Sequence, residues 1–100
     1  MEKINEKFMH LEIVSPVATL YSGEATSVIV PGTDGAFQLL DNHAPIVSIL
    51  MEGIVKVKGA TLSDKAKKHF TAGKDAGEIT LAIKSGTVEM KDNKVIVLVD

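Results

Sequence analysis

Short runs rich in valine, isoleucine and threonine recur along this 100-residue sequence, and glycine, proline, aspartate or asparagine separates one run from the next. Such residues favour a pleated backbone, and runs at intervals of about 8–12 residues are typical of β-sandwiches and β-barrels. No helix-forming stretch longer than about ten residues interrupts them. The sequence therefore predicts an all-β fold, a β-sandwich, with strands at residues 11–13, 17–21, 25–30, 37–40, 46–51, 54–58, 79–83, 87–91 and 94–99.

One domain is expected, because domains typically hold roughly 100–150 residues. Residues 1–9 are predicted to be an N-terminal extension and residues 10–100 to form the sandwich. Within the sandwich, residues 59–77 are a polar, lysine-rich insertion bracketed by glycines. Ser63 is suited to cap a short helical turn there, with Asp64 and Lys68 paired four residues apart. The alternative is an extended hairpin tip in which residues 69–71 form a strand.

The charge and composition of the chain argue against several classes of function. A formal net charge of −2 and only four aromatic residues do not suit nucleic-acid binding, which needs a basic surface or a stacking platform. Without cysteine there is no disulfide framework, no cysteine-ligated zinc and no thiol nucleophile. No apolar run approaches the ~20 residues of a transmembrane helix, and the first nine residues lack the features of a signal or transit peptide.

Three segments carry more apolar side chains than one buried face can hold. A two-layer sandwich exposes the outer face of each sheet, so its strands normally alternate apolar and polar residues. Residues 28–30 and 95–99 are apolar throughout, and residues 45–51 are apolar except at Ser48. Covering loops or simple exposure could explain any one of these strands. For all three together, we predict a partner protein that covers an outer face.

His43 is the candidate for chemistry, because Asp41 lies two residues away and shares its face if the segment is extended. A zinc site would need further ligands at suitable spacing, and neither His10 nor His69 supplies them. As a general base, His43 would need a nucleophile within reach, and the serines lie in no nucleophile-elbow sequence. The glycines match no nucleotide-binding motif. We therefore predict no catalytic residue, metal or cofactor, and interpret His43 as a corner or interface residue.

Four segments carry a resemblance to a known family. They are HLEIVSP, LYSGEATSVIVPGTDGAF, NHAPIVSILMEGIVKV and SGTVEMKDNKVIVLVD, which follow one another between residues 10 and 100. In this order and spacing, the chain resembles the epsilon subunit of F-type ATP synthases, which is called delta in mitochondria. The most specific element is the run of a turn, His43-Ala44-Pro45, an apolar strand, a glycine and a second strand.

The resemblance implies an N-terminal β-sandwich of about ten strands, without the C-terminal α-helical hairpin that follows in longer relatives. It implies a non-catalytic part of the rotating central stalk, which binds the gamma subunit and the c-subunit ring and helps couple proton translocation to ATP synthesis. No cofactor and no helix-mediated inhibition are expected. The implied location is the cytoplasmic face of a bacterial inner membrane, peripheral and within the complex, although a plastid-encoded subunit would begin in the same way.

The resemblance also assigns two contact regions. The ring-facing turn falls on Thr33, Asp34, Gly35 and Ala36, and the gamma-facing corner falls on Asn42, His43, Ala44, Pro45 and Ile46. Relatives commonly carry an acidic residue where this chain has Ala36. They often carry glycine at the positions of Gln38 and Asn42, and asparagine tolerates the positive φ that glycine permits better than glutamine does.

Two other classes of function remain open at this point. One is a free-standing ligand-binding sandwich, for instance a carbohydrate module, although such modules usually present aromatic platforms. The other is a small hydrolase that uses His43 with Asp41. Replacing His43 with alanine would abolish activity in the hydrolase but would only weaken assembly of a stalk subunit.

Overall fold

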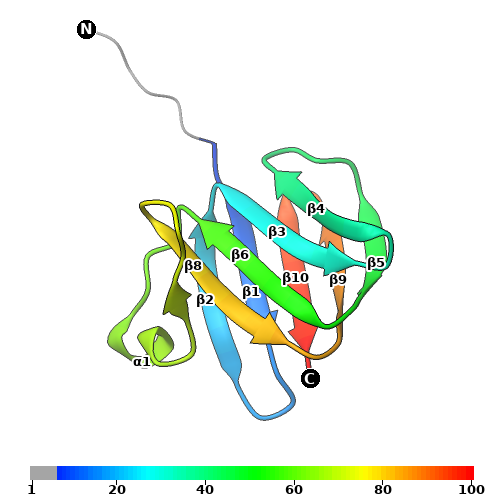
Figure 1. Cartoon of the computed structure of the whole chain (residues 1–100). Coiled ribbons are helices and arrows are strands. Elements are labelled where there is room, and N and C mark those ends of the chain that lie inside the picture. The colour runs from blue at the N-terminus through cyan, green and yellow to red at the C-terminus, as the bar shows by residue number, and fades with distance from the viewer. Residues whose placement is uncertain (1–6) are drawn as a thin grey trace, which may run out of the picture.

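The computed structural model describes residues 7–100 and has the all-β architecture predicted from the sequence (Figure 1). Residues 1–6, most of the predicted extension, lie outside the described part, and Met9 is already the first residue of a strand. Within residues 7–100 the elements are β1 (Met9–Val14), β2 (Thr19–Ala25), β3 (Ser27–Gly32), β4 (Gly35–Leu40), β5 (Ile46–Leu50), β6 (Gly53–Lys58), α1 (Asp64–Lys67), β7 (Thr71–Ala72), β8 (Glu78–Ile83), β9 (Gly86–Lys91) and β10 (Lys94–Val99).

The strands form one hydrogen-bonded sheet that curls into two layers. Its order is β2-β1-β10-β9-β5-β3-β6-β8-β7, and β4 pairs with β3. A single residue pair, Gly32 with Leu50, joins the two halves between β3 and β5. Figure 1 shows β3, β6 and β8 lying in front of β1, β10 and β9. Neighbouring strands run antiparallel except β1 and β10, which pair in parallel.

The core lies between these layers and is built by alternation along the strands. On β10, Val95, Val97 and Val99 are buried, whereas Leu98 is exposed. The opposite layer contributes alternate residues in the same way, among them Val55 and Val57 of β6. Burying such a side chain stabilises the fold by roughly 1.5–3 kcal/mol. The apolar run 95–99 is therefore not buried on both faces, since its even-numbered residues face outward.

The second strand differs from the prediction at both ends. The strand begins at Thr19, because Val17 lies in the preceding turn and is 92% exposed. It continues through Ser22 and Gly23, which were expected to end it. Gly23 makes room for an aromatic side chain here rather than a turn, because a Cβ at this position would meet the Tyr21 hydroxyl at 2.7 Å. That hydroxyl donates a hydrogen bond to the carbonyl of Glu24 at 2.6 Å.

The insertion at residues 59–77 contains both elements that were considered as alternatives. The helical turn α1 begins after Ser63, whose Oγ accepts a hydrogen bond from the Ala66 amide at 3.2 Å. Asp64 pairs with Lys67 at 3.8 Å, so the predicted pairing with Lys68 is wrong; the short helix places the i+3 side chain within reach. The extended part is β7, which pairs with β8 and begins at Thr71, later than the predicted 69–71.

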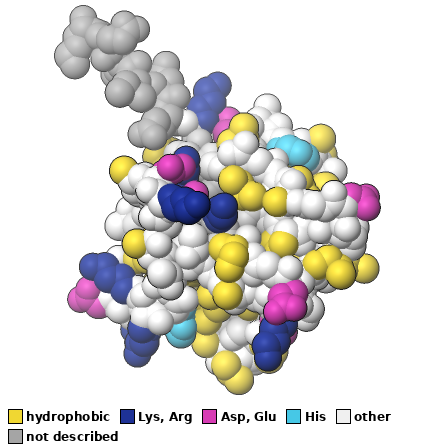
Figure 2. Space-filling model, in the orientation of Figure 1, with side chains coloured by type: hydrophobic (Ala, Val, Ile, Leu, Met, Phe, Trp, Pro, Cys, Tyr) yellow, Lys and Arg dark blue, Asp and Glu magenta, His cyan; other side chains and the backbone are white. Residues whose placement is uncertain are grey.

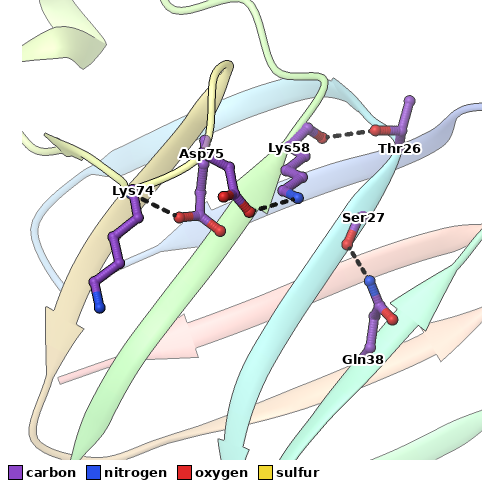
Figure 3. A network of polar contacts seen from close by, with 7 residues as sticks. Thr26, Ser27, Gln38, Lys58, Lys74 and Asp75 are labelled. Carbon is purple, nitrogen blue, oxygen red and sulfur yellow. Dashed lines mark hydrogen bonds and ion pairs between the residues drawn. The ribbon is translucent and has the colours of Figure 1, made fainter.

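Several contacts hold the insertion against the sandwich. The ring of Phe70 meets the ring of Tyr21 edge-on, with centroids 6.5 Å apart and planes at 87°. Lys58, at the end of β6, forms an ion pair with Asp75 at 3.0 Å, and its carbonyl accepts hydrogen bonds from the amide and the hydroxyl of Thr26. Figure 3 shows Lys58 between Thr26 and Asp75. The hydrogen bond to Asp75 and its charge raise the pKa of the Lys58 ammonium above its usual value.

Candidate functional site

The predicted gamma-facing residues form the corner between β4 and β5. Asn42 has a positive φ of 64°, as the comparison with glycine suggested. The His43 amide donates to the carbonyl of Leu40 at 3.1 Å, which closes the turn. Residues 42–45 are exposed, and Ile46 is half-buried at the start of β5. By contrast, Gln38 lies in the regular part of β4, where its Nε2 donates to Ser27 Oγ at 2.7 Å (Figure 3).

The predicted ring-facing residues lie at the tip of the β3–β4 hairpin. Gly32 pairs with Gly35, so Thr33 and Asp34 form a two-residue loop, and Gly35 has the positive φ of 116° that favours glycine. Thr33, Asp34, Gly35 and Ala36 are all exposed. The tip and the corner lie at opposite ends of β4, roughly 17 Å apart at about 3.4 Å per residue. The structure therefore keeps the two predicted contact regions apart.

Asp41 and His43 do not form the pair that a hydrolase would need. The Oδ1 atom of Asp41 accepts a hydrogen bond at 2.7 Å from the side-chain amide of Asn93. The Nδ1 atom of His43 lies 2.7 Å from the carbonyl oxygen of Ala44. Among residues 7–100, no group of three or more histidines and carboxylates is arranged to hold a metal ion. In that part of the chain, no helix is long and apolar enough to span a bilayer.

An exposed apolar surface extends from the corner over the outer face of β5, β9, β10 and β1. On β5, Val47 and Ile49 are 74% and 64% exposed, and on β10 Leu98 is 50% exposed. The strand register places Ile49, Thr87, Leu98 and Val14 in one row across this face. The neighbouring row contains Val47, Glu89, Ile96 and Glu12. We call Val14, Val47, Ile49, Ile96 and Leu98 the apolar band.

The outer face of the opposite layer has a more mixed surface. In Figure 2, hydrophobic side chains are scattered among polar ones on the visible face, and basic side chains gather at the lower left, where Figure 1 places α1. Lys65, Lys67 and Lys68 are the exposed lysines of that segment. The only tyrosine of the sequence, Tyr21, is buried, and burial raises its pKa above the usual value. Its ring is therefore inside the sandwich and forms no surface platform for a ligand.

Sequence reasoning found the apolar strands but not the residues that make the apolar band. Continuous apolar runs at 45–51 and 95–99 indicated a surplus, yet they did not tell inward positions from outward ones. The sequence analysis did not single out Asn93, whose side chain contacts Asp41 and Asn42 at the corner. The sequence indicates only a turn at Asp92-Asn93, where the structure gives both residues a positive φ, 53° and 62°; it does not indicate the contact with the corner.

Comparison with known proteins decides the family. Residues 8–100 match the family described as ATP synthase, Delta/Epsilon chain, beta-sandwich domain. The chain belongs to this family. Over 96 residues, this delta/epsilon chain is 38% identical to the ATP synthase epsilon chain of Chlorobium limicola, covering 96% of this chain and 93% of that protein. It is 35% identical over 92 residues to the epsilon chain of Campylobacter concisus, of which it spans only 60%.

Solved structures support the fold of this delta/epsilon chain. A chain from the central stalk and c-ring of Tetrahymena thermophila mitochondrial ATP synthase superposes with a TM-score of 0.66 at 12% identity. That match covers 96% of this chain and 66% of the other. A chain of the Euglena gracilis mitochondrial ATP synthase gives a TM-score of 0.68 at 15% identity, over 98% of this chain and 53% of the other.

Proposed function

We propose that this chain is a non-catalytic subunit of the central stalk of an ATP synthase. In this proposal it binds the gamma subunit through the corner and the apolar band, and the c-ring through the hairpin tip, and so helps couple proton translocation to ATP synthesis. Its place is the cytoplasmic face of a bacterial inner membrane, as part of the complex. The membership of the delta/epsilon family supports this role.

The observation that carries the gamma contact is the exposure of the apolar band next to the corner. Val47 is exposed on β5 two residues after Pro45, the exposed residue that directly precedes this strand, so the band begins next to the corner. Contiguous exposed apolar surface on a small domain marks an interaction site. A rotor part must not slip under torque, which favours a large apolar interface over a small hydrated one.

Charge around the band favours a specific orientation of the partner. Glu89 and Glu12 stand in the same row as Val47 and Ile96, so acidic side chains alternate with apolar ones across the face. Glu89 lies between Val47 and Ile96, inside the band, and a carboxylate covered by a partner needs an opposite charge or a hydrogen-bond donor on that partner. We expect basic residues on gamma opposite Glu12 and Glu89.

The experiment is co-elution of this chain with its cognate gamma subunit, using Val47→Lys as the test variant. Val47 is exposed in the free chain, so lysine is tolerated there but places a charge in the interface. The affinity for gamma should fall at least about tenfold, which corresponds to ~1.4 kcal/mol. Ile54→Lys is the matched control, because Ile54 is 44% exposed on β6 in the opposite layer. It should leave binding unchanged.

Two outcomes would overturn the proposal. The first is a wild-type chain that stays separate from gamma at micromolar concentrations. The second is a complex that Val47→Lys and Ile54→Lys weaken equally, since the band would then have no special part in binding.

A further inference from the structure

We infer that Asn93 is a positioning residue that holds the corner in the shape presented to gamma. This inference rests on the proposed function. Asn93 lies in the β9–β10 turn, about fifty residues further along the chain than the corner, and touches it through its side chain. The backbone amide of Asn42 donates to Asn93 Oδ1 at 2.7 Å, and Asn93 Nδ2 donates to Asp41 Oδ1 at 2.7 Å.

Asn93 also forms hydrogen bonds with the residues at the start of β1. Asn93 Nδ2 donates a second hydrogen bond to the carbonyl of Phe8 at 3.1 Å, and the backbone carbonyl of Asn93 accepts from the His10 amide at 3.1 Å. Chemistry determines how the side-chain amide is oriented. The Asn42 amide can only donate, so it must face the oxygen, whereas the Asp41 carboxylate and the Phe8 carbonyl can only accept, so they must face the nitrogen.

The corner has little else to hold it. Asp41 is half-buried and residues 42–45 are exposed. The hydrogen bond from the His43 amide to the Leu40 carbonyl is the backbone bond that closes this turn. Asn42 also adopts the left-handed conformation, which is less favourable than the extended one for residues other than glycine. The Asn93 side chain accepts a hydrogen bond from the Asn42 amide and donates one to the Asp41 carboxylate. These two bonds stabilise one conformation of residues 41–43. Pre-ordering a binding loop removes part of the entropy cost of association.

Asn93→Gly tests the side chain without disturbing the turn, because glycine accepts the positive φ of 62°. In the free chain, hydrogen exchange of the Asn42 amide should become at least about tenfold faster, the effect of losing one to two net hydrogen bonds. Asp92→Gly is the matched control. It removes a neighbouring side chain from a residue of the same turn, also with positive φ, and should leave the Asn42 amide protected.

Binding to gamma supplies the functional readout, and a charge exchange supplies the rescue. Asn93→Asp places a carboxylate against Asp41, so the Kd for gamma should rise about tenfold or more. Asp41→Asn combined with Asn93→Asp restores a donor facing an acceptor between positions 41 and 93, and the new carboxylate still accepts from the Asn42 amide, but the Phe8 carbonyl loses its donor. This double variant should therefore recover part of the affinity that Asn93→Asp loses. All variants are compared fully folded, as judged by circular dichroism, because a change in stability alone would then leave the measured affinity unchanged.

The results separate the inference from the function on which it rests. Faster exchange in Asn93→Gly without any wild-type binding to gamma would overturn the proposed function and with it the interface role of the corner. Wild-type binding that survives both Asn93→Gly and Asn93→Asp unchanged would overturn the inference and leave the proposed function standing. Unchanged exchange of the Asn42 amide in Asn93→Gly would also overturn the inference.

Discussion

Tyr21 shows how one side chain organises its surroundings at the scale of single residues. Its ring is buried in the core, its hydroxyl donates to the carbonyl of Glu24, and Gly23 leaves room for it. In the sequence, Ser22-Gly23 looks like the end of a strand. The glycine is instead required by the size of a neighbouring aromatic ring, a constraint that local turn preferences do not contain.

The ionisation of Tyr21 gives a prediction at this scale. Burial, the largest cause, disfavours the phenolate and raises the pKa of Tyr21 above its usual value of 10.0. Because the pKa is raised in the folded state, this contribution to stability is complete below about pH 10 and is lost as the pH rises through the folded pKa. The free energy of unfolding should therefore fall in alkaline solution.

Tyr21 is the only tyrosine, so the ultraviolet absorbance of its phenolate reports the titration directly. The folded chain should titrate above pH 10 and the urea-unfolded chain close to it. Equal midpoints in the two states would contradict the prediction. Tyr21→Phe is the control, because it removes the absorbance change together with this part of the pH dependence.

At the scale of elements, the insertion is a packed part of the fold rather than a loose loop. Ala66 is buried, Phe70 packs on Tyr21 and Lys58 pairs with Asp75. We predict that Phe70→Ala lowers the free energy of unfolding by about 1–3 kcal/mol, since it removes half-buried apolar area and an edge-to-face contact. Urea denaturation measures the loss. Lys68→Ala, an exposed change two residues earlier, should stay within about 0.5 kcal/mol of the parent chain.

Most of the element pattern could be predicted from the sequence, because period-two alternation decides which segments become strands. β5, β6, β8, β9 and β10 lie where the apolar runs lie. The two elements of the insertion could not be separated, because β7 is two residues long and depends on pairing with β8. The corner could be placed from its motif. Asn93 could not, because its three side-chain partners lie 51 to 85 residues away in the sequence.

At the scale of the whole molecule, β4 separates two surfaces that belong to different proposed partners. The hairpin tip lies at its beginning and the corner follows its end. Because the chain contains no cysteine, a single introduced thiol identifies its neighbour without ambiguity. With a photoactivatable maleimide attached to the introduced thiol, Asp34→Cys in the assembled complex should cross-link to a c subunit on illumination, and His43→Cys should cross-link to gamma.

Lys65→Cys, on the insertion, is the control for this cross-linking and should give neither product. The products are identified by mass spectrometry of the excised bands. Cross-linking of Asp34→Cys to gamma, or of His43→Cys to the ring, would contradict the proposed assignment of the hairpin tip to the c-ring and of the corner to gamma.

The parallel pairing of β1 with β10 also has a consequence for synthesis. β10 lies between β1 and β9 in the sheet, so β1, which is synthesised before the other strands of this domain, gains its inner neighbour only after residues 94–99 have been made. Until then Leu11 and Ile13 lack the partners that bury them, and the pairing must close a loop of more than eighty residues. The domain therefore folds only after its last strand has emerged from the exit tunnel, however far the polypeptide continues. A chain whose translation stalls before that point offers its apolar strands to chaperones and proteases, not to the proposed partners.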